Sequence, residues 1–394
     1  MTVISLHKSN IVLPRTGNPI IGLISALNPV MTLVSTVVSL LENGASWVVV
    51  VNDGSTEPES LDVFDMITKM ECTTVLNLPK NVGKSAALRA GYLALPPDPR
   101  IIIMQTDDDT AAGRLRHPFN LIRRGKADIV DIRIETFDGN NLIGLVQQLD
   151  YWLINATIKR FQNWIRSRLW VSGASLMYTY EAGKVLLLEE SVTRTEDTEG
   201  YFRSIRAGLK LLYCSKREAA FKTMVPETMA GVRKQWQRWA LGNGQVIKLH
   251  GLGGGRKWIA LVNLCTWIEM TLSPVSQFFI GRWVSFLPWT PHVPGVDDVS
   301  QFFLGGLLTA IIWMMVFGTA VGAVGALTLH RWKLTFVGVF IPLLSLWWAF
   351  HALEGLAIAQ KYPRAESLNW VPPKRMEVAF GAEMVRAIGP GGTA

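Results

Sequence analysis

Residues Ile101–Thr110 read IIIMQTDDDT, an apolar run that leads into three consecutive carboxylates. A short apolar run of this kind predicts a buried strand over Ile101–Gln105. Carboxylates gathered at the end of a buried strand repel one another unless a cation or several hydrogen-bond donors lie beside them. Asp107 and Asp109 stand two residues apart, so both side chains could point to one side of an extended chain. Such a pair suits Mg²⁺ or Mn²⁺ completed by substrate phosphates, and a solvated acidic loop is the alternative.

The sequence before this run alternates short apolar stretches with helical patterns. Strands are predicted over Ile20–Leu27, Trp47–Asn52 and Thr73–Leu78, and helices over about Met31–Leu41, Glu57–Lys69 and Lys84–Leu95. This order is typical of an α/β domain with a largely parallel sheet. In open α/β sheets ligands bind beyond the carboxyl ends of the strands, so polar residues that follow strands are the first candidates for a site.

Two polar stretches follow predicted strands. Asp53 comes directly after the second strand, where it could accept hydrogen bonds from a base or a ribose, or could simply form a turn with Gly54. Residues 81–85 read NVGKS, but a P-loop needs a further glycine five residues before Gly83, where this chain has Leu78. A nucleoside triphosphate site is therefore excluded there. Lys84, at a helix start, could still approach a diphosphate.

Two later motifs combine acids, a base and aromatic rings. Residues 195–197 read TED, and Asp197 could either cap the following helix or act as a general base toward an acceptor hydroxyl. Residues 235–239 read QWQRW on a basic helical pattern. Arg238 offers donors suited to phosphate oxygens, and Trp239 offers a flat face for a sugar ring. A helix at a lipid interface is the alternative, but it explains only the tryptophans.

Charge and hydropathy are distributed unevenly along the chain. The formal net charge is +8, the mean hydropathy is +0.24, and the apolar surplus follows Trp258. Much of the positive charge lies near apolar stretches, at Lys159, Arg160, Arg166, Arg168, Arg233, Lys234, Arg238, Arg256 and Lys257. Positive charge in such places is typical of the cytoplasmic side of a membrane, so we expect membrane lipid as a partner and no nucleic acid.

Apolar segments near the C-terminus predict transmembrane helices. Residues 302–329 carry no charge, and spans are also expected over about 258–280 and 334–353. Two tryptophan-bearing helices, about 142–169 and 228–248, could lie in the membrane interface. For the first of these, a core helix of the α/β domain is the alternative.

The expected organisation has three parts. Residues 1–250 form a cytoplasmic α/β domain, 251–360 a transmembrane region and 361–394 a C-terminal tail. The first ten residues lack the pattern of a signal peptide, which places the N-terminal domain in the cytoplasm of an integral protein of the cell membrane. The tail is basic, yet three spans would put it outside, so its side stays open.

Four motifs, taken in order, resemble those of the family 2 glycosyltransferases. They are Asp53, the pair Asp107 and Asp109, the TED of residues 195–197 and the QxxRW of residues 235–239. The likeness is greatest to the membrane synthases of cellulose, chitin and hyaluronan. It implies a Rossmann-like GT-A fold in which Asp53 and Lys84 lie near the nucleotide and the diphosphate. Asp107 and Asp109 would hold nucleotide and metal, and Asp197 would be the catalytic base.

The same resemblance implies further contacts. Gln235 and Arg238 would bind the donor, and residues 171–175, VSGAS, are similar to the segment near the acceptor sugar. Four residues would therefore contact the acceptor: Trp239, Ser172, Gly173 and Glu196. The family's Pro-Tyr-Asn after the first strand is here Ala26-Leu27-Asn28, and fewer membrane helices leave less material for a polymer channel.

The expected reaction is an inverting, metal-dependent transfer of a sugar from a nucleotide-sugar donor, a UDP-sugar, to a growing β-linked polysaccharide at the membrane. One alternative is the transfer of a single sugar to a lipid or other membrane-associated acceptor. Another is an inactive donor-binding or scaffold subunit. The motifs do not distinguish one sugar from another.

Overall fold

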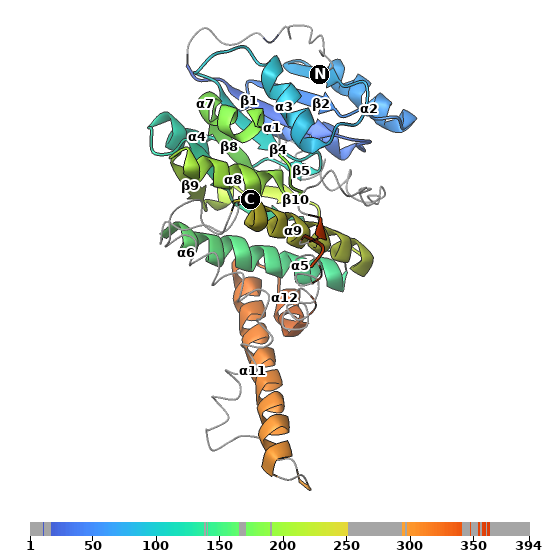
Figure 1. Ribbon diagram of the computed structural model, residues 1–394, viewed down its shortest axis with the longest axis vertical. Coiled ribbons are helices and arrows are strands. Elements are labelled where there is room, and N and C mark those ends of the chain that lie inside the picture. Colours follow the sequence, from blue (N-terminus) through green and yellow to red (C-terminus); the bar gives the residue numbers. More distant parts are fainter. Residues whose placement is uncertain are drawn as a thin grey trace. The chain divides into compact units, whose positions relative to one another are not determined.

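The computed structural model describes residues 11, 17–137, 139, 141–164, 171–189, 191–250, 294–295, 298–340, 347, 354, 357–359 and 361–362 (Figure 1). These residues form two compact units. The first unit comprises the described residues up to Phe137 and from Lys159 to Met224, and the second those of Asp138–Ile158 and Val225–Asn369. Residues 138–158 and 225–250, which the sequence pattern places in the N-terminal domain, thus group with the C-terminal part of the chain.

The first unit is built on a seven-stranded mixed sheet with the order β3-β2-β1-β4-β8-β6-β9. Strands β3, β2, β1 and β4 are parallel, β8 is antiparallel to both of its neighbours, and β6 and β9 are parallel. The bounds are β1 Ile20–Ala26, β2 Trp47–Asn52, β3 Thr73–Asn77, β4 Ile102–Thr106, β6 Ile129–Ile132, β8 Leu176–Thr179 and β9 Leu211–Cys214. The four strands predicted from sequence are confirmed to within one residue at each end.

Helices cover both faces of this sheet. Gly22 of β1 lies against Leu40 of α1, whereas Leu23 lies against Gly91 of α3. Because successive residues of a strand point to opposite faces, α1 and α3 lie on opposite sides of the sheet. Burial on both faces explains the continuous apolar run Val48–Val51, whose side chains have no exposed surface. The helices of this unit are α1 Thr32–Glu42, α2 Pro58–Thr68, α3 Lys84–Ala94, α4 Arg116–Arg123, α6 Lys159–Trp164, α7 Tyr180–Gly183 and α8 Glu196–Arg206.

A small second sheet follows the acidic cluster. Its order is β5-β10-β7, with β5 Thr110–Ala111, β7 Ile134–Thr136 and β10 Phe221–Thr223. Strand β10 pairs antiparallel with β5 and parallel with β7. Thr110 is fully buried and follows Asp109 directly, so this sheet fixes the chain immediately after the carboxylates.

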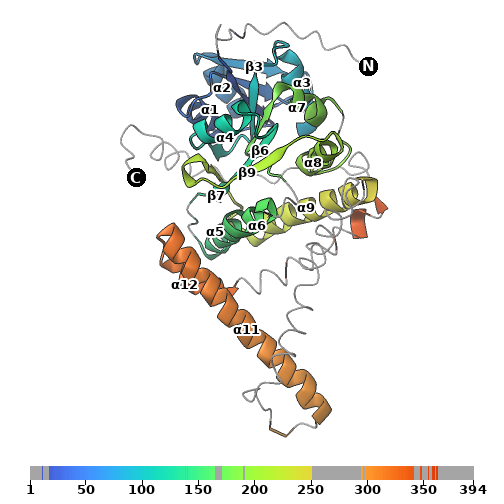
Figure 2. The same ribbon diagram turned by 90° about the vertical axis from the view of Figure 1, so that its left-hand side faces the viewer.

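The second unit consists of helices among its described residues. They are α5 Leu142–Leu153, α9 Met229–His250, α11 Asp298–Leu329 and α12 Lys333–Val337, with a π-helical turn Ile154–Ile158 after α5 (Figure 2). Leu149 and Trp152 of α5 are buried in one cluster with Ala326 of α11 and Leu334 of α12. The helix expected over 142–169 is therefore not a single α-helix. Its first part packs on α11 and α12 and belongs to the second unit, not to the α/β core, and residues 165–169 lie outside the described part. A position of this helix at a membrane interface stays a prediction.

The transmembrane prediction gains no support here. Within the part of the chain that the structure describes, no helix is both long and apolar enough to cross a membrane. Residues 302–329 fall within α11, and 334–353 begin with α12 and a 3₁₀ turn at Gly338–Phe340. The stretch 258–280 and the tail 361–394, apart from Lys361 and Tyr362, lie outside the described residues.

A glycine next to the site is expected to be irreplaceable. Gly54 has a φ of 70°, and a Cβ there would overlap the backbone of Lys80 and Asn81. Gly125 has a φ of 65° but open space around it, which makes it a matched control. We expect Gly125→Ala to lower the free energy of unfolding by about 1 kcal/mol, for the positive φ alone, and Gly54→Ala by about 2–4 kcal/mol. Urea denaturation followed by tryptophan fluorescence measures both, and equal losses would contradict the close packing at Gly54.

Candidate active site

Asp53 holds the loop that leads into α3. It is 3% exposed, and its two carboxylate oxygens accept hydrogen bonds from the backbone N–H groups of Val82 (2.7 Å) and Gly83 (2.9 Å). Burial raises the pKa of the Asp53 carboxyl, and the two hydrogen bonds oppose that rise only in part. The chain after β2 is thereby tied to the start of α3, where Lys84 lies. The predicted contact of Asp53 with a nucleotide stays a prediction.

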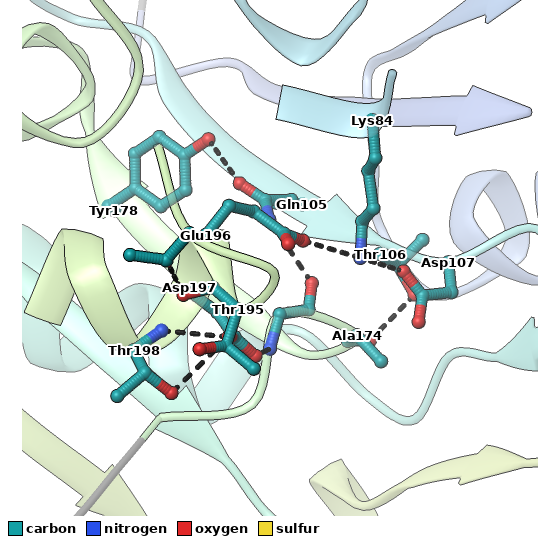
Figure 3. Close-up of polar contacts among 12 residues, drawn as sticks. Lys84, Gln105, Thr106, Asp107, Ala174, Tyr178, Thr195, Glu196, Asp197 and Thr198 are labelled. Atoms are coloured by element: carbon teal, nitrogen blue, oxygen red, sulfur yellow. Dashed lines mark hydrogen bonds and ion pairs between the residues drawn. The ribbon is translucent and has the colours of Figure 1, made fainter. Parts of the chain in front are cut away.

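Lys84 joins two acidic segments that are distant in sequence. Its Nζ lies 2.7 Å from Oδ1 of Asp107, after β4, and 2.9 Å from Oε1 of Glu196, at the start of α8 (Figure 3). Burial alone would lower the pKa of the Lys84 ammonium, but the carboxylates of Asp107 and Glu196 raise it above its ordinary value. The ammonium therefore stays charged, and it brings together three of the residues predicted for the site.

Asp107 and Asp109 differ in their surroundings. The Asp107 side chain is 31% exposed, whereas Asp109 is 8% exposed, with its Oδ1 3.4 Å from the Thr110 hydroxyl. Among the described residues, no group of three or more acidic, histidine or cysteine side chains could hold a metal ion. Two carboxylates completed by substrate oxygens are nevertheless a fitting donor set for Mg²⁺ or Mn²⁺. Asp107 Oδ1 is already paired with the Lys84 ammonium, and the binding of a metal by Asp107 and Asp109 stays a prediction.

Asp197 is the carboxylate best suited to proton transfer. Its Oδ2 accepts a hydrogen bond from the Gly173 N–H (2.9 Å), and its Oδ1 accepts one from the Thr198 N–H (2.7 Å). Burial and the neighbouring Glu196 raise the pKa of Asp197 to about 6, although Lys84 and the two N–H groups oppose the rise. Thr195 precedes the helix and Asp197 lies within its first turn, so Asp197 is not the capping residue. A carboxyl with a pKa near neutrality suits a general base.

The segment that carries Ser172 and Gly173 is anchored on β4. Gln105 donates through Nε2 to the Gly173 carbonyl (3.3 Å) and accepts from the Tyr178 hydroxyl (3.0 Å), while Thr106 Oγ1 donates to the Ala174 carbonyl (2.7 Å) (Figure 3). Sequence reasoning did not select Gln105 or Tyr178. The available signal was a glutamine at the end of an apolar strand, because such a side chain needs a buried partner.

One charge counted as membrane-adjacent lies inside the fold. Lys159 is 3% exposed and forms an ion pair with Asp131, which is 1% exposed. Its Nζ also donates to the Ser172 hydroxyl (2.6 Å). The sequence expectation that Lys159 faces a lipid surface is therefore wrong, because two buried partners account for its charge. Ser172 is hydrogen-bonded to both Lys159 and Asp131. Its predicted contact with an acceptor sugar stays a prediction.

The QWQRW motif lies on α9 in the second unit. Between its predicted site residues, Trp236 is buried and packs on Trp347 with ring centroids 5.3 Å apart, and Gln237 donates to Glu354 Oε2 (2.7 Å). These two residues connect α9 to other residues of the second unit. The roles of Gln235 and Arg238 toward the donor, and of Trp239 toward the acceptor, stay predictions.

Removing the Lys84 ammonium should weaken the fold in a pH-dependent way. Lys84→Met leaves the carboxylates of Asp107, Glu196 and Asp197 close together without their cation. We expect the free energy of unfolding to fall by about 1–2 kcal/mol at pH 7, and by less at pH 5, where protonation of Asp197 relieves the repulsion. The control Lys69→Met breaks an exposed pair with Asp65 and should cost under about 0.5 kcal/mol at either pH. Identical losses at both pH values for Lys84→Met would argue against the charge cluster.

Comparisons with known proteins identify the family of this chain. The sequence profile described as "Glycosyl transferase family group 2" matches residues 101–353. Poly-beta-1,6-N-acetyl-D-glucosamine synthase of Staphylococcus aureus (strain COL) is 25% identical over 207 residues, which cover 51% of this chain and 48% of that protein. The Staphylococcus epidermidis enzyme of the same name is 26% identical over 222 residues, covering 55% and 52%. The chain thus spans about half the length of the curated relatives it matches.

A solved structure agrees in fold. The mannosyltransferase PcManGT from Pyrobaculum calidifontis, in complex with GDP-Man and Mn²⁺, superposes with a TM-score of 0.52 at 13% identity and covers 88% of each chain. At this identity the likeness shows the fold alone, and it confirms the expected GT-A architecture. The profile match covers more than half of the chain and takes in the acidic cluster, TED and QWQRW, so the chain belongs to the family 2 glycosyltransferases.

Proposed function

We propose that this chain catalyses the inverting, metal-dependent transfer of a sugar from a UDP-sugar to a growing β-linked polysaccharide. The observation that carries the proposal is the pairing of Lys84 with both Asp107 and Glu196, next to Asp197. A carboxyl whose pKa is about 6 thereby adjoins the acidic pair predicted for the donor. A transferase needs a base on the acceptor side and charge neutralisation on the donor side, and one ammonium joins the two.

The proposed reaction is a single displacement. Asp197 takes the proton of the acceptor hydroxyl, whose oxygen forms a bond to the anomeric carbon of the donor. The bond from that carbon to the diphosphate breaks, and its electron pair leaves with UDP. One displacement inverts the anomeric carbon, so an α-linked donor gives a β-linked product.

The donor side has to hold a diphosphate against nearby acids. Asp107 and Asp109 would hold Mg²⁺ or Mn²⁺, which would neutralise negative charge on the departing diphosphate. Lys84, at the N-terminus of α3, supplies a fixed positive charge beside Asp107. Arg238 is the further phosphate ligand that the QxxRW motif predicts.

The relatives support a polymer as product and suggest the donor to test first. The curated proteins that match about half of this chain are named as synthases of poly-β-1,6-N-acetylglucosamine. UDP-N-acetylglucosamine is therefore the first candidate donor. Transfer of one sugar to a lipid or another membrane-associated acceptor is the rival outcome.

The test is release of UDP followed by sizing of the product. Purified chain, in detergent and with Mn²⁺, is incubated with radiolabelled UDP-N-acetylglucosamine, UDP-glucose or UDP-glucuronate. We expect UDP release with at least one donor, loss of that release in EDTA, recovery with Mn²⁺ or Mg²⁺, and a ladder of labelled products. A single-sugar adduct would contradict the polymer proposal and favour transfer of one sugar to a membrane-associated acceptor. Activity that persists in EDTA would contradict the proposed dependence on a metal.

Replacing the base should abolish transfer and spare donor binding. We expect Asp197→Asn to lower kcat by about 10²–10⁴-fold, with the dissociation constant for UDP within about twofold of wild type. In the wild type, activity should rise with pH through about 6, because Asp197 must lose its proton to act. Glu196→Gln removes a neighbouring negative charge, which lowers the pKa of Asp197 and moves this rise to lower pH. An unchanged kcat in Asp197→Asn would show that Asp197 is not the catalytic base.

We also propose that the enzyme works as an integral protein of the cell membrane, with its catalytic domain in the cytoplasm. Apolar side chains of α11 and α12 are exposed, among them Val316 (53%), Leu327 (76%) and Phe336 (68%). Lipid would cover such surface. After expression in bacterial cells, we expect the chain to stay in the membrane pellet through a carbonate wash and to need detergent for release. Recovery in the supernatant without detergent would contradict this location.

A further inference from the structure

A buried ion pair lies behind the segment that holds the base. Asp131, in β6, and Lys159, the first residue of α6, are 1% and 3% exposed, with Nζ 3.0 Å from Oδ2 and 3.4 Å from Oδ1. Burying two charges costs much of the free energy that their attraction supplies, so such a pair is weak evidence for a role in stability alone. A second role is indicated by the groups that the pair contacts.

Both members of the pair contact the same residue. The Ser172 N–H donates to Asp131 Oδ1 (3.2 Å), and Lys159 Nζ donates to Ser172 Oγ (2.6 Å). The next residue, Gly173, donates its N–H to Oδ2 of Asp197 (2.9 Å). A continuous set of contacts therefore runs from the buried pair through Ser172 and the N–H of the next residue to the candidate base.

The rest of the segment is held by other contacts. The carbonyls of Gly173 and Ala174 accept from β4, and the Ser175 hydroxyl donates to the Ile132 carbonyl (2.8 Å). The Ser172 N–H and hydroxyl contact the ion pair, and the Ser172 carbonyl accepts from the Ser175 N–H (3.1 Å). The space at Gly173 is also restricted, since a Cβ there would lie 3.2 Å from Asp197 Oδ2. A small movement of Ser172 would thus change the bond between Gly173 and Asp197.

We propose that Asp131 and Lys159 are positioning residues for sugar transfer: they fix Ser172 so that the Gly173 N–H remains on the carboxylate of Asp197. This inference rests on the proposed role of Asp197 as base. Charged partners suit the task, because hydrogen bonds to ionised groups are shorter and stronger than neutral ones and hold one geometry. The pair has no net charge, so it can fix Ser172 without adding net charge near the base.

Asp131→Asn tests the proposal, because the amide keeps the shape of the side chain but removes the charge opposite Lys159. With UDP-N-acetylglucosamine, or whichever UDP-sugar the wild type uses, we expect kcat to fall about 10- to 100-fold and the KM for donor to stay within about twofold. Loss of the Gly173 hydrogen bond raises the pKa of Asp197, since that bond lowers it. The rise of activity with pH should therefore move up by about 0.5–1 pH unit. The other charged groups that act on Asp197, Glu196 and Lys84, are unchanged in this variant.

The matched control is Glu135→Gln. Glu135 pairs with Arg133 at 2.8 Å, and the two side chains are 12% and 10% exposed. Neither residue has a described contact with Ser172 or Gly173, so this variant should keep the wild-type pH profile even where it costs stability. Hydrogen exchange of the peptide spanning 171–175 should speed up in Asp131→Asn and stay at the wild-type rate in Glu135→Gln.

Ser172→Ala provides a second, milder variant in case Asp131→Asn does not fold. It removes only the hydroxyl that Lys159 contacts, and we expect the same upward shift of the pH profile and faster exchange of residues 171–175. A pH profile and exchange rate equal to wild type in the folded variant would overturn the proposal. A wild type that turns over no UDP-sugar would instead refute the proposed function, and the exchange measurement would still decide the positional role.

Discussion

Negative charge gathered at the carboxyl ends of a buried sheet is the constraint on which the first unit depends. Asp53 follows β2, Asp107 follows β4, and Glu196 and Asp197 begin α8. These groups would repel one another without compensation. The Lys84 ammonium provides it, since it contacts Asp107 and Glu196 at once and lowers the pKa of Asp197. The loop held by Asp53 in turn places Lys84 at the start of α3, so the fold near the site is organised around one cation.

Aspartates of the same chemistry acquire different properties through their neighbours. Asp53 accepts two backbone N–H bonds, and Asp107 is bound to an ammonium. Asp197 also accepts two N–H bonds, but its burial and the charge of its neighbour Glu196 both disfavour its ionised form. The pKa of Asp197 accordingly lies near 6, where the group can both take and release a proton at neutral pH. The division between donor-side acids and a base is thus a matter of environment and not of residue type.

Much of the first unit could be predicted from local sequence patterns. Pairings between residues that are distant in sequence could not be predicted. Strands β1 to β4 and helices α1 to α3 followed from apolar runs and turn residues, because those signals lie within each element. The insertion of β8 between β4 and β6 left no such signal, since its partners are far away in sequence. The position of Lys84 at a helix start could be predicted, but its contact with Glu196 could not be predicted. The amphipathic pattern of α5 predicted an apolar face. It did not predict that Ala326 and Leu334 pack on that face.

The short helix α6 has a consequence for how this segment can vary among related chains. Its first residue, Lys159, pairs with Asp131, and four residues later Asn163 accepts the backbone N–H of Tyr213 in β9 (3.0 Å). Each residue of an α-helix advances the direction of its side chains by about 100°, so one residue inserted or deleted between these two positions would rotate Lys159 away from Asp131 while Asn163 keeps its contact. Related chains should therefore tolerate substitutions between Lys159 and Asn163 more readily than changes of length. A change of length there should occur together with the loss of the acid at the position of Asp131.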